Sequence, residues 1–153
     1  YYRADRYPES IKKFDELVMF SDSKKTESGK EGSDLRQESV QYLGISFAEK
    51  DWNGDGVDDP ETGLQRIEGF YRGREEESHV RDIFQKLGDI YFDETEYAKA
   101  IEVYRRVLAK WPYAKENPKL QDRIVQADKR MRNEEAVLAD TRELALPSAV
   151  VAA

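Results

Sequence analysis

The chain has no cysteine among its 153 residues, which excludes a disulfide framework and any thiolate metal site. It also has no apolar run approaching the roughly 18 residues that a membrane-spanning helix needs. Histidine occurs once, as His79, just after the acidic residues 75–77. A single histidine before an expected helix start is predicted to be exposed to solvent rather than to bind a ligand.

The sequence lacks the side-chain sets on which enzymes depend. Catalysis needs a nucleophile with a base, a metal-held water, or two carboxylates whose environments separate their pKa values, and no such set is recognisable. A phosphate-binding glycine loop is missing too, because Gly54 and Gly56 stand among acidic residues that repel phosphate. We therefore expect no enzymatic activity.

Charged residues make up 37% of the chain, and 32 acidic against 25 basic residues give a net charge of −7. Nucleic acids and anionic membranes are disfavoured as partners, because phosphate contacts need clustered lysine and arginine and none are clustered. The acidic balance favours basic partners instead. With 39% hydrophobic residues, the length suits one compact domain or a short solenoid.

An acidic loop over residues 51–59 reads Asp-Trp-Asn-Gly-Asp-Gly-Val-Asp-Asp. Side-chain oxygens stand at positions 1, 3, 5 and 9 with glycine at position 6, which is the pattern of a calcium-binding loop. Hard oxygen ligands of this kind suit Ca²⁺ and disfavour transition metals. The expected ligands are Asp51, Asn53, Asp55, the Val57 carbonyl, Asp59 and, in the next helical turn, Glu61.

Position 12 is where the loop departs from an EF-hand, because Thr62 stands where a bidentate glutamate is usual. The loop therefore resembles the short aspartate-rich calcium loops of extracellular and envelope proteins, with a dissociation constant toward ~10⁻⁴ M. The alternative is that Asn53-Gly54 and Asp55-Gly56 are turn dipeptides that lead into Pro60. The alternate spacing together with the glycine at position 6 favours calcium, in a structural role.

The strongest periodic pattern lies in residues 76–113. Small residues stand where two antiparallel helices would approach closely, aromatic residues fill the space between them, and a proline ends the second helix. The positions are Phe84, Leu87, Gly88, Tyr91, Tyr97, Ala100, Tyr104, Val107 and Pro112. This pattern resembles one tetratricopeptide repeat (TPR). The resemblance implies an all-α solenoid of antiparallel helix pairs, wound as a right-handed superhelix without a sheet.

Weaker copies of the pattern precede it. Residues 35–75 carry Val40, Leu43, Gly44 and Phe47 in a first helix and Gly63, Leu64, Ile67 and Phe70 in a second. Phe47 to Gly63 spans 16 residues where Tyr91 to Ala100 spans 9, so the acidic segment 51–60 is an insertion between paired helices. Residues 1–20 match the second half of a truncated repeat, which indicates a piece of a longer protein.

Three segments lie outside the repeats. Residues 21–34 contain no large apolar side chain and are expected to form a flexible inter-repeat loop. Residues 114–146 show helical spacing of apolar residues and predict a long C-terminal capping helix. Its first half would cover the last repeat, while its second half projects outward or packs on a neighbouring domain. Residues 147–153 form a tail or linker.

A TPR array usually holds a partner along the face made by its first helices, and this resemblance marks candidate groove residues. They are Glu38, Gln41, Ile45, Glu49, Asp82, Gln85, Asp89, Phe92 and Asp93. The lysine, arginine and asparagine set with which chaperone-binding TPR domains clamp a terminal carboxylate is missing. The set predicts a basic and apolar partner segment, recruited by charge and held by burial. The alternative is that these acids form only a solvated face.

Together the patterns predict a protein-interaction scaffold with a Ca²⁺-stabilised loop. Repeat pattern and loop are similar to TPR proteins of the bacterial cell envelope, which implies the periplasm or envelope as its compartment. Two alternatives stay open: a structural spacer segment without a groove ligand, and a calcium-dependent regulator of partner binding.

Overall fold

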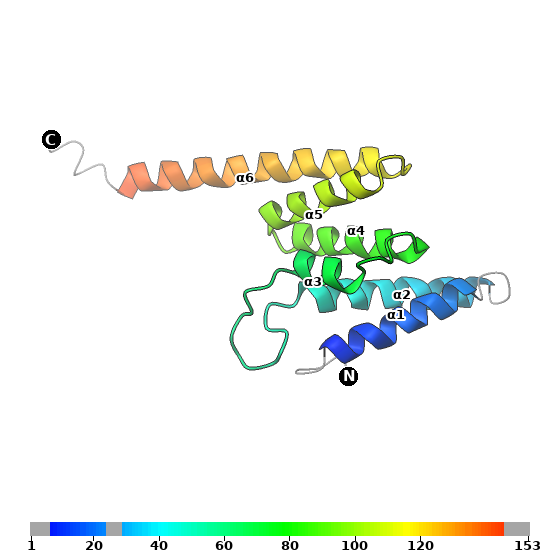
Figure 1. Ribbon diagram of the computed structural model, residues 1–153. Helices are drawn as coiled ribbons and strands as arrows, with labels where there is room; N and C mark the ends of the chain where they lie inside the picture. The colour runs from blue at the N-terminus through cyan, green and yellow to red at the C-terminus, as the bar shows by residue number, and fades with distance from the viewer. Residues whose placement is uncertain (1–6, 24–28, 146–153) are drawn as a thin grey trace.

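The computed structural model describes residues 7–23 and 29–145, with side chains at 7–22 and 35–139. In this part of the chain every regular element is a helix, which confirms the all-α prediction (Figure 1). None of these helices has the length and apolar character needed to cross a membrane. The helices are α1 (Tyr7–Ser23), α2 (Gly29–Ala48), α3 (Gly63–Phe70), α4 (Ser78–Asp93), α5 (Tyr97–Lys110) and α6 (Asn117–Ala145).

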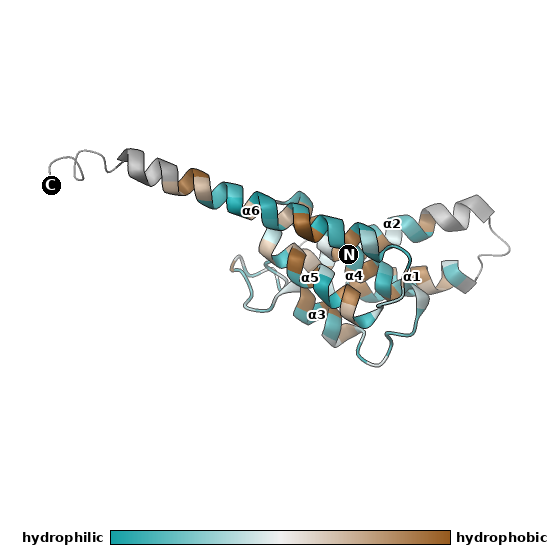
Figure 2. Cartoon of the chain, turned by 90° about the horizontal axis from the view of Figure 1, so that it is seen from above, coloured by the Kyte–Doolittle hydropathy of each residue, from teal (hydrophilic) through white to brown (hydrophobic). Residues whose placement is uncertain are grey.

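The helices stack one on the next in an elongated array. α1 packs on α2, α2 on α4, α4 on α5 and α5 on α6, while the short α3 contacts both α2 and α4. The core runs continuously between them and contains side chains from all six helices, among them Val18, Leu43, Ile67, Leu87, Tyr104 and Leu120. Apolar residues therefore lie between successive helices, and hydrophilic residues predominate along α6 (Figure 2).

The pairing of α4 with α5 follows from the apolar positions of residues 76–113. Ile83, Leu87 and Tyr91 recur at helical spacing on α4 and are buried in the core. Gly88 faces α5, where a Cβ atom built on it would come within 2.7 Å of the Tyr104 ring. The small residue therefore permits the close approach that the sequence predicted.

The first half of α6 covers α5, and its second half extends beyond the other helices. Asn117 begins the helix and donates a hydrogen bond from Nδ2 to the Trp111 carbonyl at 2.7 Å. Leu120 and Ala127 are buried against the core, whereas Leu138, on the same side of the helix, is 58% exposed. Figures 1 and 2 both show this end of α6 running past α5.

The loop predicted over residues 21–34 is wrong at both of its ends. α1 continues through Ser23 and α2 begins at Gly29, and residues 24–28 lie outside the described residues. Adding residues to an existing helix costs little once its core has packed, so polar ends can stay helical. An ion pair of 2.7 Å between Asp22 of α1 and Arg36 of α2 supports this extension.

His79 is not exposed, in contrast to the sequence prediction. It lies in the first turn of α4 with only 2% of its surface accessible, and its Nε2 is 2.9 Å from an Asp15 oxygen. Asp15, on α1, is itself 5% exposed and also accepts hydrogen bonds from the Tyr71 hydroxyl at 2.9 Å and from Arg74 at 2.7 Å. This buried network ties α1 to α4 and to the turn after α3.

The network also shifts the acidity of its members. Burial alone would raise the pKa of the Asp15 carboxyl, but hydrogen bonds from His79, Arg74 and Tyr71 outweigh it and hold that pKa below its usual range. Burial and the nearby Asp15 charge raise the pKa of Tyr71. The carboxylate is thus the charged acceptor on which three donors depend.

Candidate functional site

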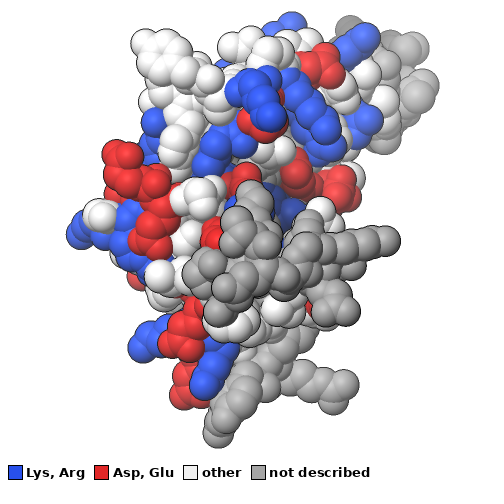
Figure 3. All heavy atoms as spheres, turned by 90° about the vertical axis from the view of Figure 1, so that its right-hand side faces the viewer, with Lys and Arg blue, Asp and Glu red and all other residues white. Residues whose placement is uncertain are grey.

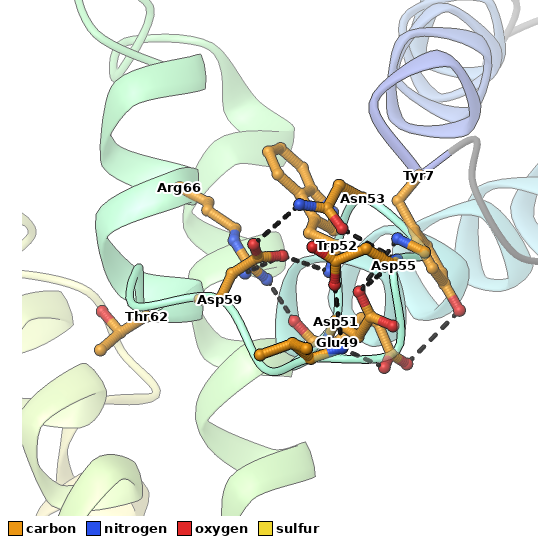
Figure 4. A network of polar contacts seen from close by, with 12 residues as sticks. Tyr7, Glu49, Asp51, Trp52, Asn53, Asp55, Asp59, Thr62 and Arg66 are labelled. Carbon is orange, nitrogen blue, oxygen red and sulfur yellow. Dashed lines mark hydrogen bonds and ion pairs between the residues drawn. The ribbon is translucent and has the colours of Figure 1, made fainter.

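The acidic loop is compact and is organised around Asp51 (Figure 4). The Asp51 carboxylate accepts backbone N–H groups from Gly54 at 3.0 Å, Asp55 at 3.2 Å and Gly56 at 2.7 Å. Gly54 and Gly56 have φ angles of 78° and 86°, in the left-handed region that favours glycine. Both glycines are therefore required by the turn itself.

Asp59 closes the other side of the loop. Its carboxylate accepts hydrogen bonds from the Trp52 backbone at 2.6 Å and from the Asn53 amide nitrogen at 3.1 Å. Its own N–H donates to the Lys50 carbonyl at 2.8 Å, which joins the two ends of the loop. The sequence-predicted ligands Asp51, Asn53, Asp55 and Asp59 thus belong to one hydrogen-bonded loop.

Of the remaining two predicted ligands, Glu61 is exposed and forms no ion pair among the described side chains. Val57, whose carbonyl is the predicted ligand, donates its backbone N–H to Asp55 at 2.8 Å. Thr62 acts as the N-cap of α3, where its hydroxyl accepts the Gln65 N–H at 3.2 Å. A capping threonine therefore occupies the position where an EF-hand supplies its last ligand.

The sequence did not point to Arg66, which lies beneath the loop. Its side chain is 1% exposed and donates a hydrogen bond to the Glu49 carbonyl. Its guanidinium carbon is 4.7 Å from the centre of the Trp52 ring, and Nη2 is 3.8 Å from an Asp59 oxygen. The Arg66 guanidinium of α3, which is always charged, thus contacts both ends of the acidic loop.

The loop fits Ca²⁺ in the type and order of its oxygens, with Asp51, Asn53 and Asp55 sharing one tight turn. Nowhere among residues with described side chains do three acidic or histidine side chains gather so as to hold a metal ion. Cation binding therefore requires the predicted ligands to gather more closely than they do here. Calcium binding stays a prediction.

Two pockets lie along the packed helices α2 and α4, and together they are called here the α2–α4 groove. The first, of about 540 Å³, is called here the glutamine pocket. The second, of about 480 Å³, is called the loop pocket because Lys50 and Asp58 border it. The glutamine pocket is lined by Arg36, Gln37, Val40, Gln41, Arg81, Asp82, Gln85, Lys86, Asp89 and Glu116. The loop pocket is lined by Ile45, Ala48, Glu49, Lys50, Asp58, Ile90, Glu94 and Glu96.

Six of the nine predicted groove residues line these pockets, and three do not. Phe92 is only 9% exposed, since the guanidinium groups of Arg123 and Arg130 cover its ring at 5.1 and 5.0 Å. Glu38 and Asp93 are exposed outside both pockets. The long helix α6 thus removes Phe92 from the surface available to a partner.

The acids of the glutamine pocket are neutralised within the chain. Asp82 forms an ion pair with Arg36 at 2.7 Å. Asp89 accepts a hydrogen bond from the Tyr104 hydroxyl at 2.5 Å and pairs with Arg123 at 3.2 Å. Acidic and basic side chains are likewise interspersed over the face seen in Figure 3. This pocket therefore offers no acidic surplus to a partner.

The loop pocket, in contrast, is acidic. Glu96 pairs with Lys50 and with Lys99, both at 3.0 Å, and these hydrogen bonds lower the pKa of its carboxyl. The carboxylates of Asp58 and Glu94 have no ion-pair partner among the described side chains. The same pocket is also lined by the apolar residues Ile45, Ala48 and Ile90.

Comparison of the chain with protein-family models, with curated proteins and with solved structures found no match.

Proposed function

We propose that the chain is a protein-interaction scaffold, built as a TPR-like solenoid, that holds an extended partner segment in the α2–α4 groove. The order of the stacked helices and the close approach at Gly88 support the repeat architecture. The loop pocket is the main support for this function, because it combines apolar side chains with unpaired carboxylates. A partner that buries the apolar surface and brings a positive charge gains binding free energy from both.

The chemistry of the loop pocket defines the partner segment. Ile45 and Ile90 offer apolar contact, while Asp58 and Glu94 attract a cation at the rim. A lysine or arginine beside an apolar residue satisfies both, since its stem packs on the apolar side chains and its head reaches the carboxylates. This is the basic and apolar segment that the sequence predicted.

Selection from a displayed library of random 12-residue peptides tests this function. We expect peptides enriched on the immobilised chain to carry lysine or arginine next to an apolar residue. Reversing one rim charge with Glu94→Lys should weaken their binding about fivefold or more, as expected for a partly desolvated charge pair. The matched control Glu135→Lys reverses an exposed charge on α6 and should leave binding unchanged. A library that yields no enriched peptide contradicts the scaffold proposal.

We also propose that Ca²⁺ binds the acidic loop and stabilises it. With a dissociation constant near 10⁻⁴ M, 1 mM Ca²⁺ adds about 1.4 kcal/mol to the folded state. The midpoint of thermal unfolding should therefore rise by about 3–6 °C in calorimetry. Asp51→Asn should abolish the rise, whereas Asp58→Asn, which changes a neighbouring acid outside the predicted ligand set, should keep it. An equal midpoint in chelator and in calcium refutes the site.

Two other functions remain as alternatives, each with its own observation. A structural spacer is favoured by the second half of α6, which extends beyond the other helices, and it predicts that no peptide is selected. A calcium-dependent regulator requires that a selected peptide bind with different affinity in chelator and in calcium. The proposed periplasmic or envelope compartment is supported by the resemblance of repeat and loop alone.

A further inference from the structure

Lys86 is the one lining cation of the glutamine pocket without an ion-pair partner among the described side chains. The other two cations that line the pocket lie close to acidic side chains. Arg36 pairs with Asp82 at 2.7 Å, and Arg81 lies 3.7 Å from Glu116. Asp89, three positions after Lys86, accepts a hydrogen bond from Tyr104 and forms an ion pair with Arg123. Lys86 is therefore the cation of this pocket whose ammonium group no described acid pairs with.

The position of Lys86 is fixed by the backbone opposite. Gly44 of α2 has no side chain, and a Cβ built on it would come within 2.7 Å of Lys86 Cγ and 2.9 Å of Ile90 Cδ1. The lysine stem thus lies in the space that the glycine leaves. An ammonium group on a stem held in this way loses less conformational freedom on binding than one on a free surface.

Amide donors accompany the charge. The Gln85 side-chain oxygen accepts a hydrogen bond from Arg81 at 3.0 Å, which fixes Nε2 as the free end of that amide. Gln41 lines the same pocket from α2. An ammonium group and amide N–H groups together suit an anionic acceptor with two oxygens, which is a carboxylate.

We propose that the glutamine pocket receives an acidic side chain of the same partner segment whose basic residue enters the loop pocket. This inference rests on the proposed scaffold function and adds the second half of the recognition motif. The two pockets follow one another along the same helices, because Gln41 and Ile45 are one turn apart on α2, as are Lys86 and Ile90 on α4. A partner segment that fills both pockets therefore continues past each of them. The carboxylate is supplied by an internal acidic residue of the segment and not by its C-terminus.

The helix geometry gives the spacing between the two partner residues. Lys86 of α4 and Glu94, the residue that caps this helix, are separated by eight positions, which corresponds to about 12 Å along the helix axis. An extended chain covers that distance in about four residues. The partner motif is an acidic residue and a basic residue about four positions apart, with an apolar residue beside the basic one. Opposite charges at the two ends also fix the direction in which the segment lies.

Selecting the same 12-residue library on the unaltered chain and on Lys86→Glu tests the motif. On the unaltered chain we expect Asp or Glu three to five positions from the basic residue, and on Lys86→Glu we expect Lys or Arg there instead. The control Lys129→Glu, on the exposed side of α6, should select the original motif.

The outcomes separate this inference from the scaffold function. A basic and apolar motif without the acid, or an acid that persists on Lys86→Glu, overturns the inference and leaves the scaffold. An acid selected only as the last residue overturns it in favour of terminal-carboxylate capture. A library without any enriched peptide overturns both.

Affinity measurement supplies a second readout that does not depend on charge reversal. For a selected peptide followed by fluorescence anisotropy, Lys86→Gln should raise the dissociation constant about fivefold. Replacing the peptide acid by glutamine should have the same effect, and combining both changes should add little. Circular dichroism of Lys86→Gln checks that the fold is kept. If the double change raised the dissociation constant by the product of the two single effects, Lys86 and the peptide acid would not be in contact.

Discussion

Asp15→Ala is expected to destabilise the protein by about 3–5 kcal/mol, the largest effect of any single change considered. The substitution leaves His79, Tyr71 and Arg74 without the carboxylate that their donors share. A buried donor that loses its partner keeps its desolvation cost. Urea denaturation followed by circular dichroism measures the loss. The control Glu16→Ala, at an exposed position of the same helix, should stay within about 0.5 kcal/mol.

The same carboxylate predicts how stability changes with pH. The pKa of Asp15 is lower in the folded chain than its ordinary value of 3.8, so the folded state favours the ionised form. Its stabilisation is complete above the unfolded pKa and is lost as the pH falls through the folded pKa. The stability gap between the unaltered chain and Asp15→Asn should therefore narrow below about pH 4. A gap that stays constant from pH 7 down to pH 3 contradicts this role.

Gly63→Ala is expected to cost about 3 kcal/mol, the second largest effect. A Cβ at this position would lie 2.6 Å from the Phe47 carbonyl oxygen and closer still to the Tyr91 hydroxyl. The carbonyl belongs to α2 backbone and cannot turn aside. The Gly63 N–H also donates to the Tyr91 hydroxyl at 3.1 Å, and displacing α3 would break this bond.

Gly69 provides a matched control within α3. A Cβ built there meets no atom within 4 Å, so Gly69→Ala should stabilise the helix by about 0.5–1 kcal/mol. The two substitutions make the same chemical change in one helix and should shift the urea midpoint in opposite directions. Equal shifts would mean that the close approach of α3 to α2 is not a feature of the folded chain.

The sequence predicted the helices well because the formation of a helix depends mainly on residues close together in the chain. Residues three and four apart decide which face of α4 and α5 is apolar, and the same rule predicted over residues 114–146 the helix that the structure has as α6. The small residues Gly63 and Gly88 were recognisable because the repeat pattern assigns them positions. These features require no knowledge of which distant segments meet.

Contacts between distant segments were not predictable in this way. Asp15 meets Tyr71 and His79 across 56 and 64 positions, and periodicity within one helix does not specify such a pair. For the same reason Phe92 was expected in the groove, although arginines from α6 cover it. Lys86 could be recognised as the unpaired cation only once the ion pairs around it were known.

Nuclear magnetic resonance of the ¹⁵N-labelled chain, titrated with a selected peptide, tests the groove most directly. Binding in the α2–α4 groove predicts that amide shifts concentrate on α2 and α4 around Ile45, Lys86 and Ile90. The outer face of α5, marked by Ala98 and Ala109, should remain unchanged. Shifts centred on that outer face, with α2 and α4 unaffected, would contradict a partner site in the groove.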